Sequence, residues 1–240
     1  MVYFIGVTQK NNESLLYYCH VKASQFFLKV VSSDDGFKFT DKGKYVIVTD
    51  VKQKEEKDYN WHSFRIAKQA DQYLLTYLPN SKTPQLNLAT SSDLIRFQKL
   101  SIVDEIKETA TIVPDFKYQN RFVMYFGEKQ IKIAYAAELN QWKADVLPVL
   151  EPRKNQWDDG NLEVGNAYFM KDYILLIYYS GTKAGAAILD HVNPKKVLYR
   201  SEEPIWQLPT DFTDSQIKPL GSIIFHGELI LYWLIDKDNL

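Results

Sequence analysis

A repeated pattern of alternating residues constrains this chain more than any other feature. In three stretches, apolar and polar residues alternate up to an acid, and an aromatic residue follows the acid four positions later. These stretches are LKVVSSDDGFKF (28–39), LNLATSSDLIRF (86–97) and IKIAYAAELNQW (131–142), with AGAAILD (184–190) as a looser copy. Alternation with a period of two is the signature of a half-buried β-strand. The repeat therefore predicts an all-β chain built from similar sheets.

Two further strand-like runs precede most of the repeats. The nearer ones end in aromatic residues and are QYLLTY (72–77), RFVMYF (121–126), DYILLIYY (172–179) and GELILYW (227–233). The farther ones are SFRIAK (63–68), ATIVPDF (110–116), EVGNAYFM (163–170) and LGSIIFHG (220–227). The repeated acids Asp35, Asp93 and Glu138 are 58 and 45 residues apart. This spacing suits four-stranded propeller blades of roughly 40–50 residues.

Counting these units predicts a five-bladed β-propeller that forms a single domain over residues 1–240. A complete first blade is expected to begin with a strand ahead of VYFIGV, but Met1 alone precedes that run. We therefore expect the first and last blades to be incomplete, or to be closed together by the termini. Asp35, Asp93 and Glu138 recur in every unit, which favours a role in the blade turns over a role in a unique site.

Composition excludes several classes of function. The formal net charge of −1 gives no global field that would gather nucleic acid or anionic lipid. The longest apolar run, YILLIYY (173–179), is far too short to span a membrane. The N-terminus has neither a basic region nor a cleavage site for a signal peptide, so a cytoplasmic location is expected unless a leader was removed. The single cysteine, Cys19, is expected to be a small buried residue.

Motifs for metal or cofactor binding are absent from the sequence. The four histidines are scattered without a His-x-x-x-His pair, and there is no glycine-rich phosphate loop and no Gly-x-Ser-x-Gly. No metal and no cofactor are therefore expected. The oligomeric state is open: an unclosed propeller edge would invite a homo-oligomer, and the chain could belong to a longer parent.

Several phrases together resemble the five-bladed propeller glycosidases, which include arabinanase and xylosidase relatives and the mannoside phosphorylases. The resemblance extends from about residue 28 to 235 and is greatest to uncharacterised bacterial glycosidases of that group. Its most specific element is VLEPR followed by Trp157-Asp158 and Glu163-x-Gly165, because order and spacing both fit. It implies a central funnel lined by the first strand of each blade, with catalytic carboxylates on those strands.

Glycoside cleavage needs one carboxylic acid to protonate the leaving oxygen and a second carboxylate to activate water or attack. The resemblance implies that Glu163 is one of the two, where relatives read Glu-x-Gly-Pro-Pro and this chain reads Glu-Val-Gly-Asn-Ala. The alternative is an ordinary acid at a strand end. Asp158 and Asp159 lie beside Gly160 and are expected to be turn residues.

The partner of Glu163 is less evident. Where relatives read Asp-Pro-Arg on the second inner strand, this chain reads Ser63-Phe64-Arg65. The candidates for catalysis are therefore Glu163, Glu108 and His62, because a histidine can donate or accept a proton near neutral pH. The candidates for substrate binding are Arg65, Trp61, Ser63, Thr109, Asn166 and Lys218. Arg65 could instead pair with a neighbouring acid, and Trp61 could instead pack in the core.

Two functions remain open from the sequence. The first is a glycoside hydrolase, or a phosphorylase of the same architecture, that acts on a small glycoside or oligosaccharide through paired carboxylates. The second is a propeller that has lost catalysis and binds carbohydrate or a protein partner. Retention of Glu163 and Arg65 favours the first, and loss of the Asp at Ser63 and of both prolines at 166–167 favours the second.

Overall fold

The computed structural model describes residues 2–50, 52–209 and 217–235, which are built from strands, turns and loops without a helix. In chain order the strands are β1 (Val2–Lys10), β2 (Glu13–Lys22), β3 (Gln25–Ser33), β4 (Thr40–Tyr45), β5 (Ile47–Thr49), β6 (Trp61–Gln69), β7 (Gln72–Pro79), β8 (Leu86–Ser91), β9 (Arg96–Val103), β10 (Ala110–Tyr118), β11 (Arg121–Phe126), β12 (Lys132–Ala136), β13 (Trp142–Ala144), β14 (Glu163–Phe169), β15 (Tyr173–Ser180), β16 (Lys183–Asp190), β17 (Val197–Arg200), β18 (Trp206–Gln207), β19 (Ile217–Phe225) and β20 (Glu228–Ile235). No helix in the described part of the chain has the length and apolar character needed to cross a membrane.

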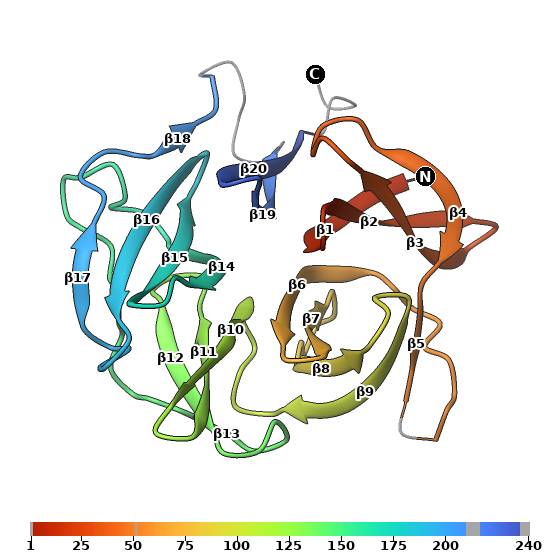
Figure 1. The fold of residues 1–240 in the computed structure, drawn as a ribbon, viewed down its shortest axis with the longest axis horizontal. Helices are drawn as coiled ribbons and strands as arrows, with labels where there is room; N and C mark the ends of the chain where they lie inside the picture. The colour runs from red at the N-terminus through yellow and green to blue at the C-terminus, as the bar shows by residue number, and fades with distance from the viewer. Residues whose placement is uncertain (1, 51, 210–216, 236–240) are drawn as a thin grey trace. The chain divides into compact units, whose positions relative to one another are not determined.

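The strands form antiparallel meanders in which neighbours along the chain pair with one another (Figure 1). The sheets are β1-β2-β3-β4, β5-β9-β8-β7-β6, β10-β11-β12-β13 and β14-β15-β16-β17, with β18 also paired to β16. Two strands depart from the meander: β5 pairs in parallel with β9, and β18 pairs with β16 instead of its neighbour β17. Four-stranded meanders of this kind are the blades of a β-propeller architecture, so the predicted all-β propeller type is confirmed.

One expectation about the ends of the chain needs correction, and the expectation of an incomplete last blade stays a prediction. The sheet that begins with β1 has four strands, so the expectation that the first blade lacks a strand was wrong. The structure describes the last sheet as the pair β19-β20. The error arose because the run VYFIGV was assigned to the second position of its blade, whereas it fills the first.

The predicted role of the repeated acids in blade turns is confirmed for two of them. Asp35 Oδ1 accepts hydrogen bonds from Ser33 Oγ and from the backbone N–H of Phe37 and Lys38, at 2.7–2.8 Å. Asp93 Oδ1 does the same with Ser91 Oγ, Ile95 N and Arg96 N, at 2.8–3.0 Å. The Glu138 turn is different: Glu138 contributes its backbone carbonyl, which accepts from Gln141 N at 3.0 Å.

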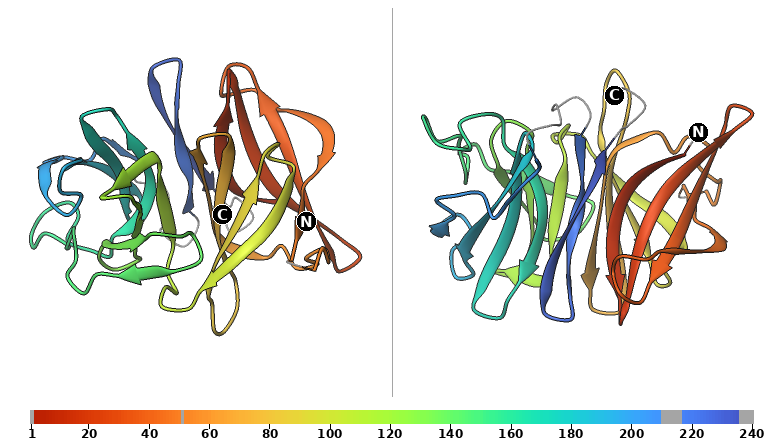
Figure 2. Two further views of the ribbon diagram at one scale, coloured as in Figure 1. Left: turned by 60° about the horizontal axis from the view of Figure 1, so that its bottom comes forward. Right: turned by 90° about the horizontal axis from the view of Figure 1, so that it is seen from above.

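The contacts divide the chain into two compact units. Unit 1 comprises residues 1–107 and 220–232, and unit 2 comprises residues 108–219 and 233–240. Within unit 1 the first strands β1 and β6 pack against each other, and within unit 2 the first strands β10 and β14 do so. Figure 2 shows the long, twisted strands of each sheet from two further sides. The prediction of a single domain stays a prediction.

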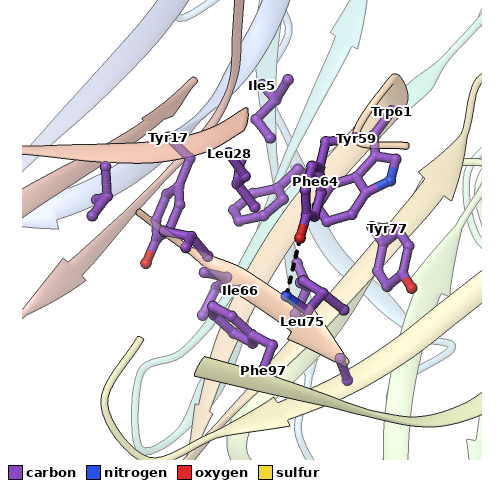
Figure 3. Packing of buried hydrophobic residues seen from close by; sticks show 14 of the residues in the cluster. Ile5, Tyr17, Leu28, Tyr59, Trp61, Phe64, Ile66, Leu75, Tyr77 and Phe97 are labelled. Carbon is purple, nitrogen blue, oxygen red and sulfur yellow. Dashed lines mark hydrogen bonds between the residues drawn. The ribbon is translucent and has the colours of Figure 1, made fainter. Parts of the chain in front are cut away.

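The core of unit 1 is aromatic. Tyr17 of β2 and Phe64 of β6 lie with ring centroids 4.7 Å apart, and both are fully buried (Figure 3). Trp61 packs against Phe64 in a stacked arrangement and against Tyr77 at 4.2 Å. The free Cys19 is fully buried in the same cluster, as predicted. Interlocked rings of this size dominate the apolar area that each sheet buries, so they fix how β6 sits on its neighbours.

The core of unit 2 is mainly aliphatic and lies between the sheets that begin with β10 and β14. Ile133 and Val123 from the first of these sheets and Leu176 and Leu189 from the second are fully buried in it. β-Branched and leucine side chains at alternate positions pack well on pleated surfaces. This packing fixes the starts of β10 and β14, where several candidate residues lie.

Candidate active site at the starts of β10 and β14

Glu163 is the first residue of β14 and is half-buried. It lies opposite Tyr179 in the pairing of β14 with β15. Its side chain therefore emerges where the strand begins. Glu163 thus begins the first strand of its sheet, where the resemblance placed it, and its catalytic role stays a prediction.

A second carboxylate, Glu128, reaches the start of the neighbouring strand β10. Its Oε1 accepts hydrogen bonds from both the backbone N–H and the hydroxyl of Thr109, at 2.9 and 2.8 Å. Thr109 is fully buried and Glu128 is half-buried. Hydrogen bonds to a carboxylate are stronger than neutral ones, so this clamp fixes the position of Glu128.

The loop that carries Glu128 also reaches β14. The backbone N–H of Leu162 donates to the carbonyl of Lys129 at 3.1 Å, and Val164 N donates to the carbonyl of Gly127 at 3.0 Å. These bonds flank Glu163 on one side and Glu128 on the other. The two acids therefore occupy facing positions on adjacent backbone segments of unit 2.

Gly127 makes this loop possible. Its φ is +142°, a conformation that side chains rarely adopt, and a Cβ built there would lie 1.9 Å from the carbonyl oxygen of Gln130. Gly127 N also donates to the carbonyl of Thr109 at 2.9 Å. The sequence signal for Glu128 was this glycine directly before an acid at the end of a strand, which sequence reasoning missed.

Asn166 lies in a β-bulge of β14. The register between β14 and β15 shifts between Val164 and Ala167, so that one extra residue stands opposite Ile177. Asn166 is buried, with 6% of its surface exposed. Bulges next to active sites redirect a side chain, and an amide can both donate to and accept from sugar hydroxyls.

The other candidates near β10 and on β19 are less enclosed. Glu108 precedes Thr109 and is half-buried, and Lys218 of β19 is half-buried as well. Unit 2 thus holds five of the predicted residues, and it brings Thr109 and Glu163 together through the Glu128 loop. The predicted residues of unit 2 are Glu108, Thr109, Glu163, Asn166 and Lys218.

The remaining predicted residues lie on β6 of unit 1. Trp61 pairs with Pro79 and Ser63 with Leu78, so His62 is the extra residue of another bulge and is exposed. Ser63 is 5% exposed and Arg65 is 3% exposed. The position where relatives have an Asp is therefore a buried serine.

Arg65 contributes to the cohesion of unit 1. Its Nη1 donates to the carbonyls of Phe64 and Leu220, at 3.0 and 3.1 Å. Its guanidinium thereby ties β6 to β19. Nη1 thus has two carbonyl acceptors, and the predicted role of Arg65 in substrate binding stays a prediction.

Trp61 is a core residue. It is 3% exposed and is surrounded by Tyr59, Phe64 and Tyr77. Both the stacked and the tilted contacts occupy its ring. The structure therefore favours the core-packing alternative over stacking on a sugar.

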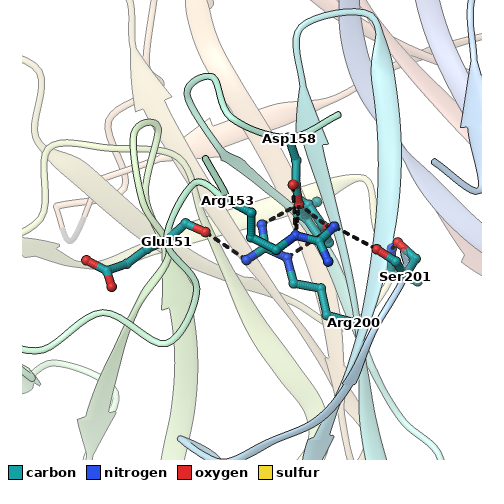
Figure 4. Close-up of polar contacts among 7 residues, drawn as sticks. Glu151, Arg153, Asp158, Arg200 and Ser201 are labelled. Carbon is teal, nitrogen blue, oxygen red and sulfur yellow. Dashed lines mark hydrogen bonds and ion pairs between the residues drawn. The ribbon is translucent and has the colours of Figure 1, made fainter. Parts of the chain in front are cut away.

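Asp158 lies in a turn, as predicted, and it is also the centre of a buried ion-pair network that the sequence did not predict. It is fully buried, and Arg153 Nε donates to its Oδ1 at 2.9 Å (Figure 4). Arg200 Nη2 forms an ion pair with its other oxygen, which also accepts from Tyr178 OH at 2.9 Å. Burial raises the pKa of Asp158, but Arg153, Tyr178 and Arg200 outweigh it and the net pKa lies below the usual range. Asp159 is exposed, as a turn residue should be.

The network also ties neighbouring segments together. Arg153 Nη2 donates to the carbonyl of Ser201 and Arg200 Nη1 to that of Glu151, each at 2.7 Å. These bonds join the loop before β14 to the end of β17. Asp158 and its two arginines therefore hold the loop ahead of Glu163 in place.

The site chemistry is that of carboxylates and neutral polar groups. Within the described residues no group of three histidine, cysteine, aspartate or glutamate side chains could hold a metal ion. Glu128 and Glu163 on facing segments, with Thr109 and Asn166 beside them, provide acids and hydrogen-bonding groups. Such a set can bind sugar hydroxyls and can exchange protons at a glycosidic oxygen.

Comparisons with known proteins agree with this chemistry. The model of glycoside hydrolase family 130, described as beta-1,4-mannooligosaccharide phosphorylase, matches residues 6–212. A 1,2-beta-oligomannan phosphorylase of Thermoanaerobacter sp. (strain X514) is 33% identical over 126 residues. That match covers 49% of this chain and 42% of the relative, so it spans less than half of the curated relative.

Solved structures share the fold. The beta-1,2-mannobiose phosphorylase of Listeria innocua, in complex with beta-1,2-mannobiose, has a TM-score of 0.76 at 19% identity, over 98% of this chain and 87% of its own. Another structure has a TM-score of 0.79 at 20% identity, over 96% of this chain and 80% of its own. It comes from work on family members that are glycoside hydrolases targeting beta-1,2 mannosidic linkages in Candida mannan.

Proposed function

Since this chain belongs to glycoside hydrolase family 130, we propose that it acts on β-linked manno-oligosaccharides, with Glu163 and Glu128 as its two carboxylates. The observation that carries the proposal is the facing of Glu128 and Glu163, which the Thr109 clamp and the bonds of Leu162 and Val164 maintain. Glu128 thereby supplies the second acid that is missing at Ser63. The resemblance of the fold supports the same class of substrate.

In the simplest version the reaction is hydrolysis. One of the two acids, in its protonated form, gives its proton to the glycosidic oxygen as the bond from that oxygen to the anomeric carbon breaks. The other, as a carboxylate, takes a proton from the water whose oxygen forms the new bond to that carbon. In phosphorolysis, inorganic phosphate replaces water as the attacking group and the product is a glycosyl phosphate.

We place the site in a propeller whose fifth blade includes β19 and β20. The support is the two-stranded sheet that these strands form after four sheets of at least four strands. Family membership supports the same count, because the resemblance in the sequence is to five-bladed enzymes.

A second function is favoured by a specific observation. Ser63 stands where relatives carry an Asp, so this position offers no carboxylate. The serine is also buried. A protein that binds manno-oligosaccharides without cleaving them fits that loss. In that case Thr109, Asn166 and the two glutamates would bind hydroxyl groups only.

Turnover assays separate the two functions. The wild type is incubated with β-1,2- and β-1,4-mannobiose, with and without inorganic phosphate, and released mannose and mannose 1-phosphate are measured. We expect turnover that falls by about 10²–10⁴-fold in Glu163→Gln and in Glu128→Gln, the range that acid–base groups contribute. Glu138→Gln, which removes an exposed acid in a blade turn, is the matched control and should retain activity.

The outcomes decide between the proposals. Wild-type turnover that survives both substitutions removes the two glutamates from the mechanism. Binding of mannobiose by calorimetry without turnover, weakened by Glu163→Gln, supports the non-catalytic function. Neither binding nor turnover with any of these mannosides rejects both.

A further inference from the structure

A cleft of about 790 Å³ lies in unit 2, remote from the candidate site. It is lined by side chains of the β10–β11 hairpin, of β12 and β13, and of the loop after β16. Thr109 adjoins one end of β10 and the cleft residue Tyr118 forms the other end. At about 3.3 Å per residue, the nine steps along the strand from Thr109 to Tyr118 span roughly 30 Å. The cleft therefore shares no residue with the glutamate pair.

Two tyrosines and an arginine form a stacked group in this cleft. The guanidinium of Arg121 lies 4.7 Å from the ring centroid of Tyr135 and 5.8 Å from that of Tyr118. The two rings are 5.9 Å apart, and all three side chains are half-buried. Arg121 Nη2 also donates to Gln119 Oε1 at 3.2 Å. Stacking and this bond hold the guanidinium in a defined orientation before any ligand arrives.

The opposite wall is also fixed. Lys195 Nζ donates to Asp145 Oδ2 at 2.7 Å, and this bond lowers the pKa of Asp145. Tyr125 OH donates to the carbonyl of Pro194 at 2.7 Å, so the loop that carries Lys195 is anchored to the sheet of β10–β13. The cleft is thus built from two segments that hydrogen bonds lock together.

The charge of the cleft is positive. Arg121, Lys143 and Lys195 contribute three positive charges, and Asp145 contributes one negative charge. The whole chain, by contrast, carries a formal charge of −1. Lys143 is exposed and extends from β13 toward the same space. A locally cationic cleft on a nearly neutral protein attracts an anion of matching size.

From this arrangement we propose that the cleft is a second binding site, which takes a sugar carrying a phosphate or a carboxylate. The anionic group is bound by Arg121 and Lys143, because guanidinium and ammonium groups form charge-assisted hydrogen bonds with such anions. The sugar ring packs on the exposed parts of Tyr118 and Tyr135, whose aromatic faces suit the apolar side of a sugar. The volume lies within the roughly 300–1,000 Å³ that small-ligand sites span.

Calorimetry on the whole chain tests this site. The probes are mannose 1-phosphate, a glucuronic acid disaccharide, mannobiose as the neutral sugar and inorganic phosphate as the bare anion. We expect at least one anionic sugar to bind about tenfold more tightly than mannobiose and phosphate, and which one binds identifies the anion. Binding should weaken as ionic strength rises, because salt screens exposed charges.

Variants locate the binding. Arg121→Gln should weaken binding of the anionic sugar by about tenfold or more. Arg96→Gln makes the same change at an exposed arginine of unit 1 and should leave the affinity unchanged. Lys143→Gln is a second test that removes an exposed charge without touching the stacked rings. Turnover at the glutamate pair, where present, should be unchanged in both cleft variants, so this inference and the proposed function can fail separately.

Three results would overturn the inference. One is equal affinity for anionic and neutral sugars. Another is equal loss in Arg121→Gln and Arg96→Gln. The third is no detectable binding of any anionic sugar to the wild type.

Discussion

Thr109 donates its backbone N–H and its hydroxyl to the same oxygen of Glu128, at 2.9 and 2.8 Å. The clamp joins the start of β10 to the loop that faces Glu163. The position of the Glu128 carboxylate therefore depends on a residue that is itself neither an acid nor a base.

Thr109→Val should weaken this clamp. The substitution keeps the size of the side chain but removes one donor, and hydrogen bonds to charged groups contribute about 1.5–3 kcal/mol when buried. Because Glu128 is half-buried, we expect the free energy of unfolding to fall by about 1–2 kcal/mol, measured by urea denaturation. Thr109→Ser, which retains the hydroxyl, should lose less. Equal losses in the two variants would show that the hydroxyl contributes nothing.

Gly127→Ala should distort the loop that carries Glu128. The new Cβ would lie 1.9 Å from the carbonyl oxygen of Gln130, at a φ that alanine rarely adopts. Strained backbone and overpacking each cost about 1–3 kcal/mol, so a loss of about 3 kcal/mol in the free energy of unfolding is expected.

Gly43→Ala is the control for this prediction. Its φ is also positive, at +68°, but a Cβ there meets nothing within 4 Å. It should cost about 1 kcal/mol, the ordinary penalty for a left-handed residue. Similar losses at the two glycines would contradict the close approach at Gly127.

Asp158→Asn should be strongly destabilising. The variant leaves Arg153 and Arg200 without their buried carboxylate, and breaking a buried pair in this way costs about 3–5 kcal/mol. The pKa of Asp158 is lowered in the folded chain, so its stabilisation is present above the pKa of the unfolded state and is lost as the pH falls through the folded value. When unfolding is measured from pH 7 downward, the free energy of unfolding should therefore fall more steeply with pH in the wild type than in the variant.

The exposed neighbour provides the comparison. Asp159→Asn removes the same charge one residue away and should change stability by less than about 0.5 kcal/mol. If Asp159→Asn and Asp158→Asn behave alike, the network in Figure 4 does not stabilise the loop.

Asp35→Asn should reduce the loss of stability at acidic pH while leaving the turn itself intact. Hydrogen bonds from Lys38 N, Phe37 N and Ser33 Oγ lower the pKa of Asp35 to about 2. A depressed pKa stabilises the folded state above the unfolded value near 3.9 and loses that contribution as the pH falls toward about 2. Asparagine keeps an oxygen that can accept these hydrogen bonds, but its amide does not take up a proton in this pH range. Melting temperatures between pH 5 and pH 2 should thus vary less in Asp35→Asn than in Asp34→Asn, and equal slopes would refute the assignment.

The strands could be predicted from the sequence because each carries its own alternation of side chains. SFRIAK, RFVMYF and AGAAILD all fall within the observed β6, β11 and β16. The position of VYFIGV within its blade could not be predicted in this way, because alternation identifies a strand but not its order in a sheet. That order depends on which strand packs on β6, a contact distant in sequence.

The candidate site was predictable in part. Glu163 stood out through a phrase with fixed order and spacing, and it does begin β14. Glu128 did not, because its role comes from a hydrogen bond across 19 residues and from a glycine with a strained φ. The ion pairs of Asp158 were not foreseen for a similar reason, since Arg200 lies 42 residues away in sequence.

The turns at Asp35 and Asp93 share one backbone shape, with a left-handed residue directly after the acid. That residue is Gly36 in the first turn, with φ of +78°, and the buried Leu94 in the second, with φ of +68°. Leucine tolerates this shape only because the serine and aspartate hold the chain and the core encloses its side chain. The same pair of serine and aspartate oxygens thus shapes this turn in two sheets, whether the left-handed position holds a glycine or a leucine packed in the core. The hydroxyl oxygen of the serine and one carboxylate oxygen of the aspartate are the side-chain atoms that both turns have in common.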